Sequence, residues 1–168
     1  YTSPVVRNGV LYGLSPRLHA FALNAATGKT LWRYDPGLPG GAQRGLMWWE
    51  KGADQRIFYN VGSILIALNA KDGTPVTTFA ENGRLDLTPT DVERAGYLSV
   101  TVPGVVFEDT LLLGFSTTEG ADSYPGTVRA VSAIDGSPVW QFNMIPRPGE
   151  RGAETWAQGA LEQAGGAN

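Results

Sequence analysis

The stretch of the sequence best equipped for chemistry is the polar run Ser116-Thr-Thr-Glu119, which follows an apolar segment at residues 111–115. Hydroxyl groups can donate hydrogen bonds to a carboxylate, and a glutamate can bind Ca²⁺ through one or both oxygens. Arg44 adds a guanidinium, whose planar fork can bond a carboxylate in two places. Residues 116–126 form a polar loop that interrupts an expected β-hairpin, and functional residues concentrate on such loops. This polar loop is therefore a place where a ligand could bind, and the types of these side chains suit a charged one.

Each candidate also has an ordinary structural explanation. Glu119 could be a solvated side chain at a loop tip, and Arg44 could pair with a surface acid. The sequence has no phosphate-binding loop, no Cys/His cluster and no Ser/His/Asp order. Its single histidine, His19, lies in an apolar strand, where a structural role is expected. Several aspartates fall in expected turns or loops without the spacing of an acid–base pair: Asp35, Asp86, Asp91 and Asp109.

A threefold repeat organises the chain around these candidates. Residues 22–32, 67–76 and 130–140 share a small opening residue, a Thr-Gly or Asp-Gly pair five residues later, and an apolar residue three positions beyond the glycine. The Thr-Gly and Asp-Gly pairs indicate tight turns, because glycine adopts positive φ without steric cost. The apolar run before each turn predicts a buried strand.

The repeat spacing is typical of β-propeller blades of about 40–50 residues. We therefore predict an all-β fold, a partial β-propeller with blade-like units at residues 4–36, 44–80 and 97–142 and an irregular segment at 143–168. Three tryptophans are interpreted as aromatics that dock one blade on the next: Trp32, Trp140 and Trp156. The alternative is a β-sandwich whose hairpins share glycine turns.

Composition narrows the function classes. The net charge is −3 with no Lys/Arg cluster, so nucleic acid is not expected as a partner. The chain has no cysteine and no apolar run of membrane-spanning length. Three blades are fewer than the four to eight of closed propellers. We interpret the chain as a piece of a longer protein, and its open sheet edges leave self-association as an expectation.

Several linked motifs carry a resemblance that covers essentially all 168 residues. The most specific are Arg-Gly-Leu-Met-Trp-Trp at 44–49, Ser116-Thr-Thr-Glu119 and Gly-Gly-Ala-Asn at 165–168; Phe-Ala-Glu-Asn-Gly-Arg-Leu-Asp-Leu at 79–87 and Ile-Pro-Arg-Pro-Gly-Glu at 145–150 add to them. With these motifs the chain resembles the first part of the eight-bladed propeller of the PQQ-dependent (quinoprotein) dehydrogenases, nearest to the glucose-dehydrogenase-like branch. The methanol-oxidising branch fits less well, because Gly40–Gln43 stands where that branch has an adjacent cysteine pair.

The resemblance implies two cofactors, PQQ and Ca²⁺. PQQ is a planar ortho-quinone with three carboxylates, and in the family it lies at the propeller axis beside the ion. By the resemblance, Arg44 pairs with a PQQ carboxylate and Thr101 donates a hydroxyl hydrogen bond to it. The resemblance also gives PQQ contacts to Ser116, Thr117, Thr118 and Asn168, and makes Glu119 a Ca²⁺ ligand. Thr117 and Thr118 replace the small Gly-Ala of the alcohol-oxidising branch.

The resemblance implies part of a periplasmic dehydrogenase, whose parent could be membrane-anchored. It would oxidise an alcohol or sugar hydroxyl and pass electrons to a respiratory acceptor, a quinone or cytochrome c. The family's catalytic aspartate and its remaining Ca²⁺ ligands would follow Asn168, so we expect the fragment to be inactive alone. Two alternatives stay open: a non-catalytic propeller scaffold of the outer-membrane assembly-factor type, and a sugar-binding β-domain that uses exposed tryptophans.

Overall fold

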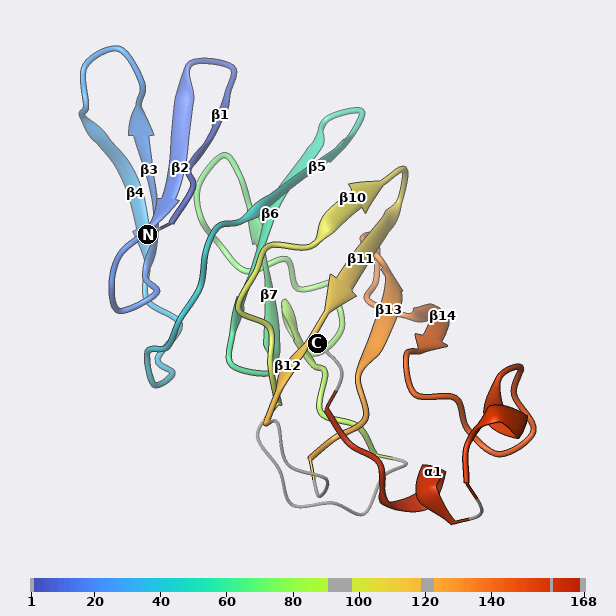
Figure 1. Ribbon diagram of the computed structural model, residues 1–168. Coiled ribbons are helices and arrows are strands. Elements are labelled where there is room, and N and C mark those ends of the chain that lie inside the picture. The colour runs from blue at the N-terminus through green and yellow to red at the C-terminus, as the bar shows by residue number, and fades with distance from the viewer. Residues whose placement is uncertain (1, 91–97, 119–122, 158, 167–168) are drawn as a thin grey trace.

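Three four-stranded antiparallel sheets make up the chain in sequence order (Figure 1). The computed structural model describes residues 2–90, 98–118, 123–157 and 159–166. Blade I contains β1 (Val5–Arg7), β2 (Val10–Leu14), β3 (Ala20–Asn24) and β4 (Thr30–Tyr34). Blade II contains β5 (Met47–Lys51), β6 (Asp54–Val61), β7 (Ile64–Asn69) and β8 (Arg84–Asp86). Blade III contains β10 (Val105–Phe107), β11 (Thr110–Gly114), β13 (Thr127–Ser132) and β14 (Pro138–Asn143). The predicted partial propeller is confirmed.

The repeated stretch folds into the same turn three times. In each copy the first turn residue donates its N–H to a carbonyl five positions on, and its own carbonyl accepts the N–H of the glycine. The pairs are Asn24–Lys29, Asn69–Thr74 and Ser132–Ser137, each at 2.8 Å. The three glycines have φ of +71°, +75° and +79°. Because these angles strain a residue with a Cβ, the glycine in each copy is required by its backbone.

Two hydrophobic cores lie between the blades. Strand β6 contributes to both, because alternate side chains point to opposite faces of a sheet. Ile57 and Tyr59 pack against Tyr12 and Trp32 of blade I, whereas Phe58 belongs to the core shared with blade III. Six consecutive residues at the end of β6 are buried for this reason. Blade II is therefore covered on both faces.

Large aromatic side chains join each blade to the repeated turn of the next. Trp32 is 9% exposed, and its Nε1 donates to the Ala70 carbonyl at 3.0 Å. A Cβ on Gly73 would lie 2.5 Å from its ring, so glycine leaves the space that Trp32 fills. Trp140, at the matching position of blade III, is 47% exposed. The docking role predicted for the tryptophans is thus seen for Trp32, whereas Trp140 and Trp156 are partly exposed in the described part of the chain.

The second blade extends beyond the predicted unit. Its fourth strand, β8, begins at Arg84 and pairs with β7, although the predicted unit ended at residue 80. The chain turns back there because Ala80, Asn82 and Gly83 all adopt positive φ. The Gly83 carbonyl then accepts the Ala67 N–H at 2.8 Å, which brings the chain back onto β7.

The third blade is interrupted as predicted. Between β11 and β13 the chain leaves the sheet as β12 (Ser116–Thr117), which pairs with β9 (Leu98–Ser99). After β14 the described residues form a 3₁₀ turn, η1 (Ala153–Thr155), and the short helix α1 (Ala160–Gln163). Neither helix in the described ranges has the length and apolar character needed to cross a membrane.

Candidate functional site

Three lead-in segments, residues 2–3, 43–45 and 100–101, precede the first strands of the three blades and lie side by side. The Ser3 N–H donates to the Arg44 carbonyl at 2.8 Å, and the Arg44 N–H donates to the Thr101 carbonyl at 2.9 Å. Ser3 and Gly45 also form a parallel bridge. Backbone hydrogen bonds between blades therefore bring Arg44 and Thr101 together, although they are far apart in the sequence.

Gly45 makes this close approach possible. A Cβ at this position would lie 3.1 Å from Pro103 Cγ and 3.3 Å from the Ser3 carbonyl oxygen. Both distances are shorter than ordinary van der Waals contacts, so a side chain would push the lead-in segments apart. The Arg-Gly pair of the sequence thus combines an exposed cation with a residue that lets three chain segments converge.

Ser116 reaches the same place from blade III. Strand β11 ends at Gly114, Phe115 is buried, and Ser116 pairs with Ser99 as β12 begins. The Arg129 guanidinium lies 4.7 Å from the centre of the Phe115 ring and donates to the Leu87 carbonyl at 2.7 Å. Phe115 is therefore packed on one side by a cation and holds the start of β12 in position.

A pocket of about 390 Å³ lies where these segments meet. Its lining residues are Arg44, Thr101, Val102, Gly114, Phe115 and Ser116. Arg44 is exposed, and among the described residues nothing pairs with its guanidinium. None of the described lining residues carries a carboxylate, and their polar side chains offer one cation and two hydroxyls. Such a donor set suits an anion.

The structure brings together three of the predicted residues and leaves the others apart or undescribed. Arg44, Thr101 and Ser116 share the pocket. Thr117 is buried and donates to the Thr118 carbonyl at 3.3 Å; neither threonine lines the pocket. Glu119 and Asn168 lie outside the described residues. The described ranges contain no group of three or more His, Cys, Asp or Glu side chains able to hold a metal.

The segment before Asn168 returns to the neighbourhood of the Ser116–Thr118 stretch. The Gly126 N–H donates to the Gly166 carbonyl at 2.7 Å, and the Gly166 N–H donates to the Tyr124 carbonyl at 3.1 Å. A Cβ on Gly166 would lie 3.7 Å from the Thr118 carbonyl oxygen. Gly165 packs against Ser123 without room for a side chain. The Gly-Gly pair is thus needed for this close packing.

Sequence reasoning missed Gln43 as a member of this region. Its side chain is 5% exposed, although residues 39–42 and Arg44 around it are exposed. Nε2 lies 3.3 Å from the Asn60 carbonyl and 3.2 Å from the Val100 carbonyl, and Oε1 accepts the Arg44 N–H at 2.8 Å. A glutamine in a Gly/Pro-rich loop gives no signal that it is buried. Its burial follows from its hydrogen bonds to segments that are distant in the sequence.

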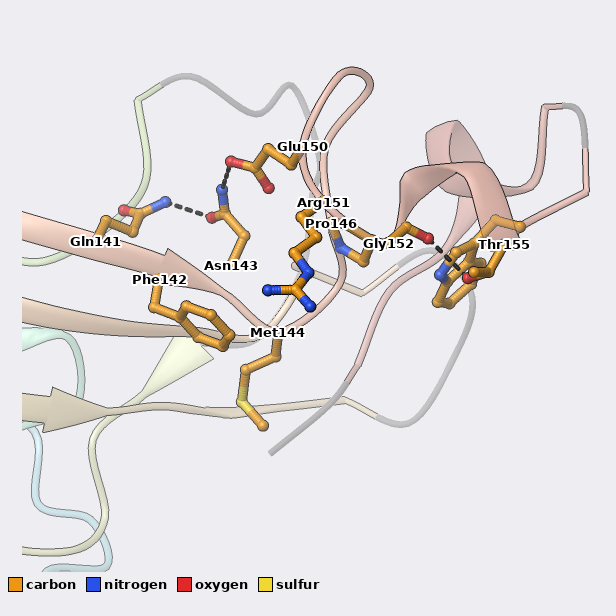
Figure 2. Close-up of a pocket in the computed structure, with 10 residues that line it drawn as sticks. Gln141, Phe142, Asn143, Met144, Pro146, Glu150, Arg151, Gly152 and Thr155 are labelled. Atoms are coloured by element: carbon orange, nitrogen blue, oxygen red, sulfur yellow. Dashed lines mark hydrogen bonds between the residues drawn. The ribbon is translucent and has the colours of Figure 1, made fainter.

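A second pocket, of about 350 Å³, lies beside β14, and none of the described residues lines both pockets (Figure 2). Figure 2 shows Arg151 directed toward Phe142 and Met144. Glu150 accepts hydrogen bonds from Asn143 Nδ2 and from the Arg147 N–H, both at 2.8 Å. The Arg147 N–H in particular lowers the pKa of Glu150. These bonds hold the loop after β14 against that strand, which is a structural role.

Comparison with known proteins places the chain in a family. The β-propeller domain of glucose/ethanol/alcohol dehydrogenases of the PQQ type matches residues 1–168. The dehydrogenase subunit of an alcohol dehydrogenase (quinone) from Gluconobacter oxydans is 32% identical over 158 residues, which cover 87% of this chain and 19% of that protein. A quinoprotein glucose dehydrogenase from Escherichia coli is 28% identical, with 84% and 20% covered.

A solved structure agrees with these relatives. A quinohemoprotein alcohol dehydrogenase from Pseudomonas putida HK5 superposes with a TM-score of 0.76 at 25% identity, covering 98% of this chain and 25% of that one. The chain thus spans about a fifth of the length of the curated relatives that it matches. With the matched domain covering every residue, this chain belongs to the PQQ-type glucose/ethanol/alcohol dehydrogenase β-propeller family.

Proposed function

We propose that this chain supplies part of the PQQ site of a dehydrogenase that oxidises an alcohol or a sugar hydroxyl. The observation that carries the proposal is the Arg44 guanidinium, which borders a pocket together with the Thr101 and Ser116 side chains and has no partner among the described residues. PQQ is planar and carries carboxylates. An arginine fork and two hydroxyl donors match that charge and geometry.

Five of the six described lining residues have a role in this proposal. Arg44 bonds a carboxylate in two places, and the Thr101 and Ser116 hydroxyls donate to PQQ oxygens. Phe115 and Gly114 provide an apolar wall for the ring system. Bound PQQ supplies the redox chemistry, because its quinone accepts the two electrons removed from an alcohol. The protein groups bind and orient the cofactor.

The proposal also includes four residues that are not among the described lining of the pocket: Thr117, Thr118, Glu119 and Asn168. Thr117 and Thr118 continue the chain from Ser116, and Asn168 follows Gly166, which packs near the Thr118 carbonyl. We assign them to PQQ contacts and assign Glu119 to Ca²⁺. The described pocket residues include no carboxylate, so the Ca²⁺ part of the proposal rests on Glu119 and the sequence motif.

The wider activity is proposed from the relatives. Their names describe alcohol and glucose dehydrogenases, which supports an alcohol or sugar substrate for the protein containing this chain. We further propose a respiratory quinone or cytochrome c as electron acceptor and a periplasmic location. Because the chain spans about a fifth of its relatives, the substrate contacts and the catalytic base are assigned to segments outside it.

Titration of PQQ into the 168-residue chain, followed by quenching of tryptophan fluorescence, tests the proposal. Arg44→Ala should weaken binding by about 10- to 100-fold, the range expected when a hydrogen-bonded charge loses its partner. Arg33→Ala is the matched control, because Arg33 is an exposed arginine of β4 in blade I. Equal affinity for wild type and Arg44→Ala would overturn the proposal, and absence of binding in every variant would favour the scaffold alternative.

The metal and the activity are tested separately. With Ca²⁺ present, PQQ should bind more tightly than after chelation, and Glu119→Gln should remove that difference. The chain alone, with PQQ and Ca²⁺, should not reduce a redox dye in the presence of alcohol or glucose. Dye reduction would contradict the assignment of the catalytic base to other segments.

A further inference from the structure

Gln43 connects all three blades through one residue. Its amide nitrogen donates to the Asn60 carbonyl in β6 and to the Val100 carbonyl in the lead-in segment of blade III. Thr2, in the lead-in segment of blade I, donates a hydroxyl hydrogen bond to the Gln43 backbone carbonyl at 3.1 Å. Since the amide has two N–H groups, both donors are used, and the orientation of the amide follows from these partners.

The same side chain fixes the backbone of Arg44. The Arg44 N–H is shared between Gln43 Oε1 at 2.8 Å and the Thr101 carbonyl at 2.9 Å. On the other side, Gly45 is confined by Ser3 and Pro103. The backbone at position 44 is therefore held from both directions, while its guanidinium stays exposed beside the pocket.

Gln43 also holds the backbone next to Thr101, the second residue of the pocket. Val100, whose carbonyl accepts from Nε2, directly precedes Thr101, and Val100 is 1% exposed. One buried amide thus holds the peptide groups next to both Arg44 and Thr101. If the amide is removed, the Asn60 and Val100 carbonyls lose a donor in a buried setting, and the two segments can separate.

We propose that Gln43 is a positioning residue for the anion site: it sets the spacing between the Arg44 guanidinium and the Thr101 hydroxyl that together receive a carboxylate. This inference rests on the proposed function, in which that carboxylate belongs to PQQ. Gln43 does not line the pocket, so it acts through Arg44 and Thr101.

A double-mutant cycle on PQQ affinity tests the proposal, with wild type, Gln43→Met, Arg44→Ala and the double variant. Methionine keeps the length of the side chain and removes the hydrogen bonds. Gln43→Met should weaken PQQ binding by about tenfold, as loss of a supporting partner does at other preorganised sites. In the Arg44→Ala background the same change should cost much less, because the group that it positions is gone.

Controls separate positioning from general stability. Phe79→Leu loosens the core between blades II and III, where Phe79 is fully buried and is not a pocket residue, and should lower the melting temperature without changing PQQ affinity. If Gln43→Met does not fold, Gln43→Asn takes its place in the cycle. That side chain keeps an amide but is one methylene too short to reach both carbonyls.

The outcomes are distinct. Equal losses of affinity from the Gln43 change in both backgrounds, or no loss in either, would overturn the positioning role. If Arg44→Ala weakens binding and the Gln43 variants do not, the proposed function stands and this inference fails. If none of the variants differs from wild type in PQQ affinity, the proposed function itself fails, and the positioning role fails with it.

Discussion

The backbone N–H of Arg44 donates to the carbonyl of Thr101 across 2.9 Å, so the chain entering blade II is bonded directly to the chain entering blade III. Next to it, the Ser3 N–H donates to the Arg44 carbonyl. A ladder between lead-in segments therefore places side chains from different blades around one pocket. The positions of these pocket side chains therefore depend on the backbone bonds between the lead-in segments.

Removing either hydroxyl from the pocket should weaken PQQ binding without affecting the fold. Ser116→Ala and Thr101→Val each delete one donor, and neither hydroxyl has a partner among the described residues. A hydrogen bond to a neutral oxygen is worth about 0.5–1.5 kcal/mol and one to a carboxylate about 1.5–3 kcal/mol, so Ser116→Ala should reduce affinity by about two- to tenfold and Thr101→Val by about 10- to 100-fold. Fluorescence titration measures the affinity and thermal unfolding checks the fold. A melting temperature that falls with the affinity would argue for a structural role.

The contact between Trp32 and Gly73 should dominate the stability of the interface between blades I and II. Trp32→Ala removes a buried indole and its hydrogen bond to Ala70, which should cost about 3–5 kcal/mol of unfolding free energy. Gly73→Ala should also destabilise, since its Cβ would meet the ring at 2.5 Å and its φ is +75°. Urea unfolding measures both. Trp140→Ala is the control, and an equal loss there would contradict the docking role.

Local chemistry explains which parts of this fold could be predicted from the sequence. The three turns were predictable because a glycine at positive φ and a short polar side chain leave a signature within a few residues. Arg44 and Thr101 were nominated by resemblance, because backbone hydrogen bonds between blades leave no pattern in the spacing of residues along the sequence. Gln43 could not be predicted, because a buried glutamine and a solvated one look alike in sequence. The return of the chain as β8 was missed because it depends on positive φ at Ala80, Asn82 and Gly83, two of which are not glycine.

Phe79 performs in blade II the role of Trp32 in blade I, at a position that the repeat does not predict. Thr77 occupies the matching place in the sequence and is exposed, whereas Phe79 is fully buried. A Cβ on Gly136 would lie 3.2 Å from the Phe79 ring, and the Ala80 N–H donates to the Asp135 carbonyl at 2.9 Å. An aromatic side chain thus packs on the turn of the next blade in both cases, although Phe79 lies two positions later in the repeat than Trp32.

Substitutions at Phe79 and Thr77 should show which of the two residues docks blade II on the turn of blade III. Phe79→Ala should lower the unfolding free energy by about 3–5 kcal/mol, the usual cost of deleting a buried aromatic ring. Thr77→Ala should change it by no more than about 0.5 kcal/mol, as expected for an exposed residue. Urea unfolding of the two variants and wild type gives the values. A larger effect at Thr77 would show that the sequence alignment of the repeats, and not the spatial match, identifies the docking residue.

The repeated turns should also contribute to stability in acid. The N–H and hydroxyl of Ser137, with the hydroxyl of Ser132, lower the pKa of Asp135 from 3.8 to about 2. The corresponding bonds from Thr74 lower the pKa of Asp72. A carboxyl with a depressed pKa binds fewer protons in the folded state, so its contribution is present above pH 3.8 and is lost as the pH falls toward 2. Thr27 holds the same place in the first turn and does not titrate in this range.

Asp135→Asn provides the test. At pH 5 the variant should have a lower urea midpoint than wild type, because its amide oxygen is a weaker acceptor than the carboxylate. The difference should shrink between pH 4 and pH 2, as the wild-type carboxylate becomes protonated. Asp72→Asn should behave in the same way, because its turn has the same geometry, with Thr74 donating to Asp72 Oδ1 at 3.0 and 2.7 Å. A difference that stays constant from pH 5 to pH 2 would mean that these hydrogen bonds stabilise the turn independently of charge.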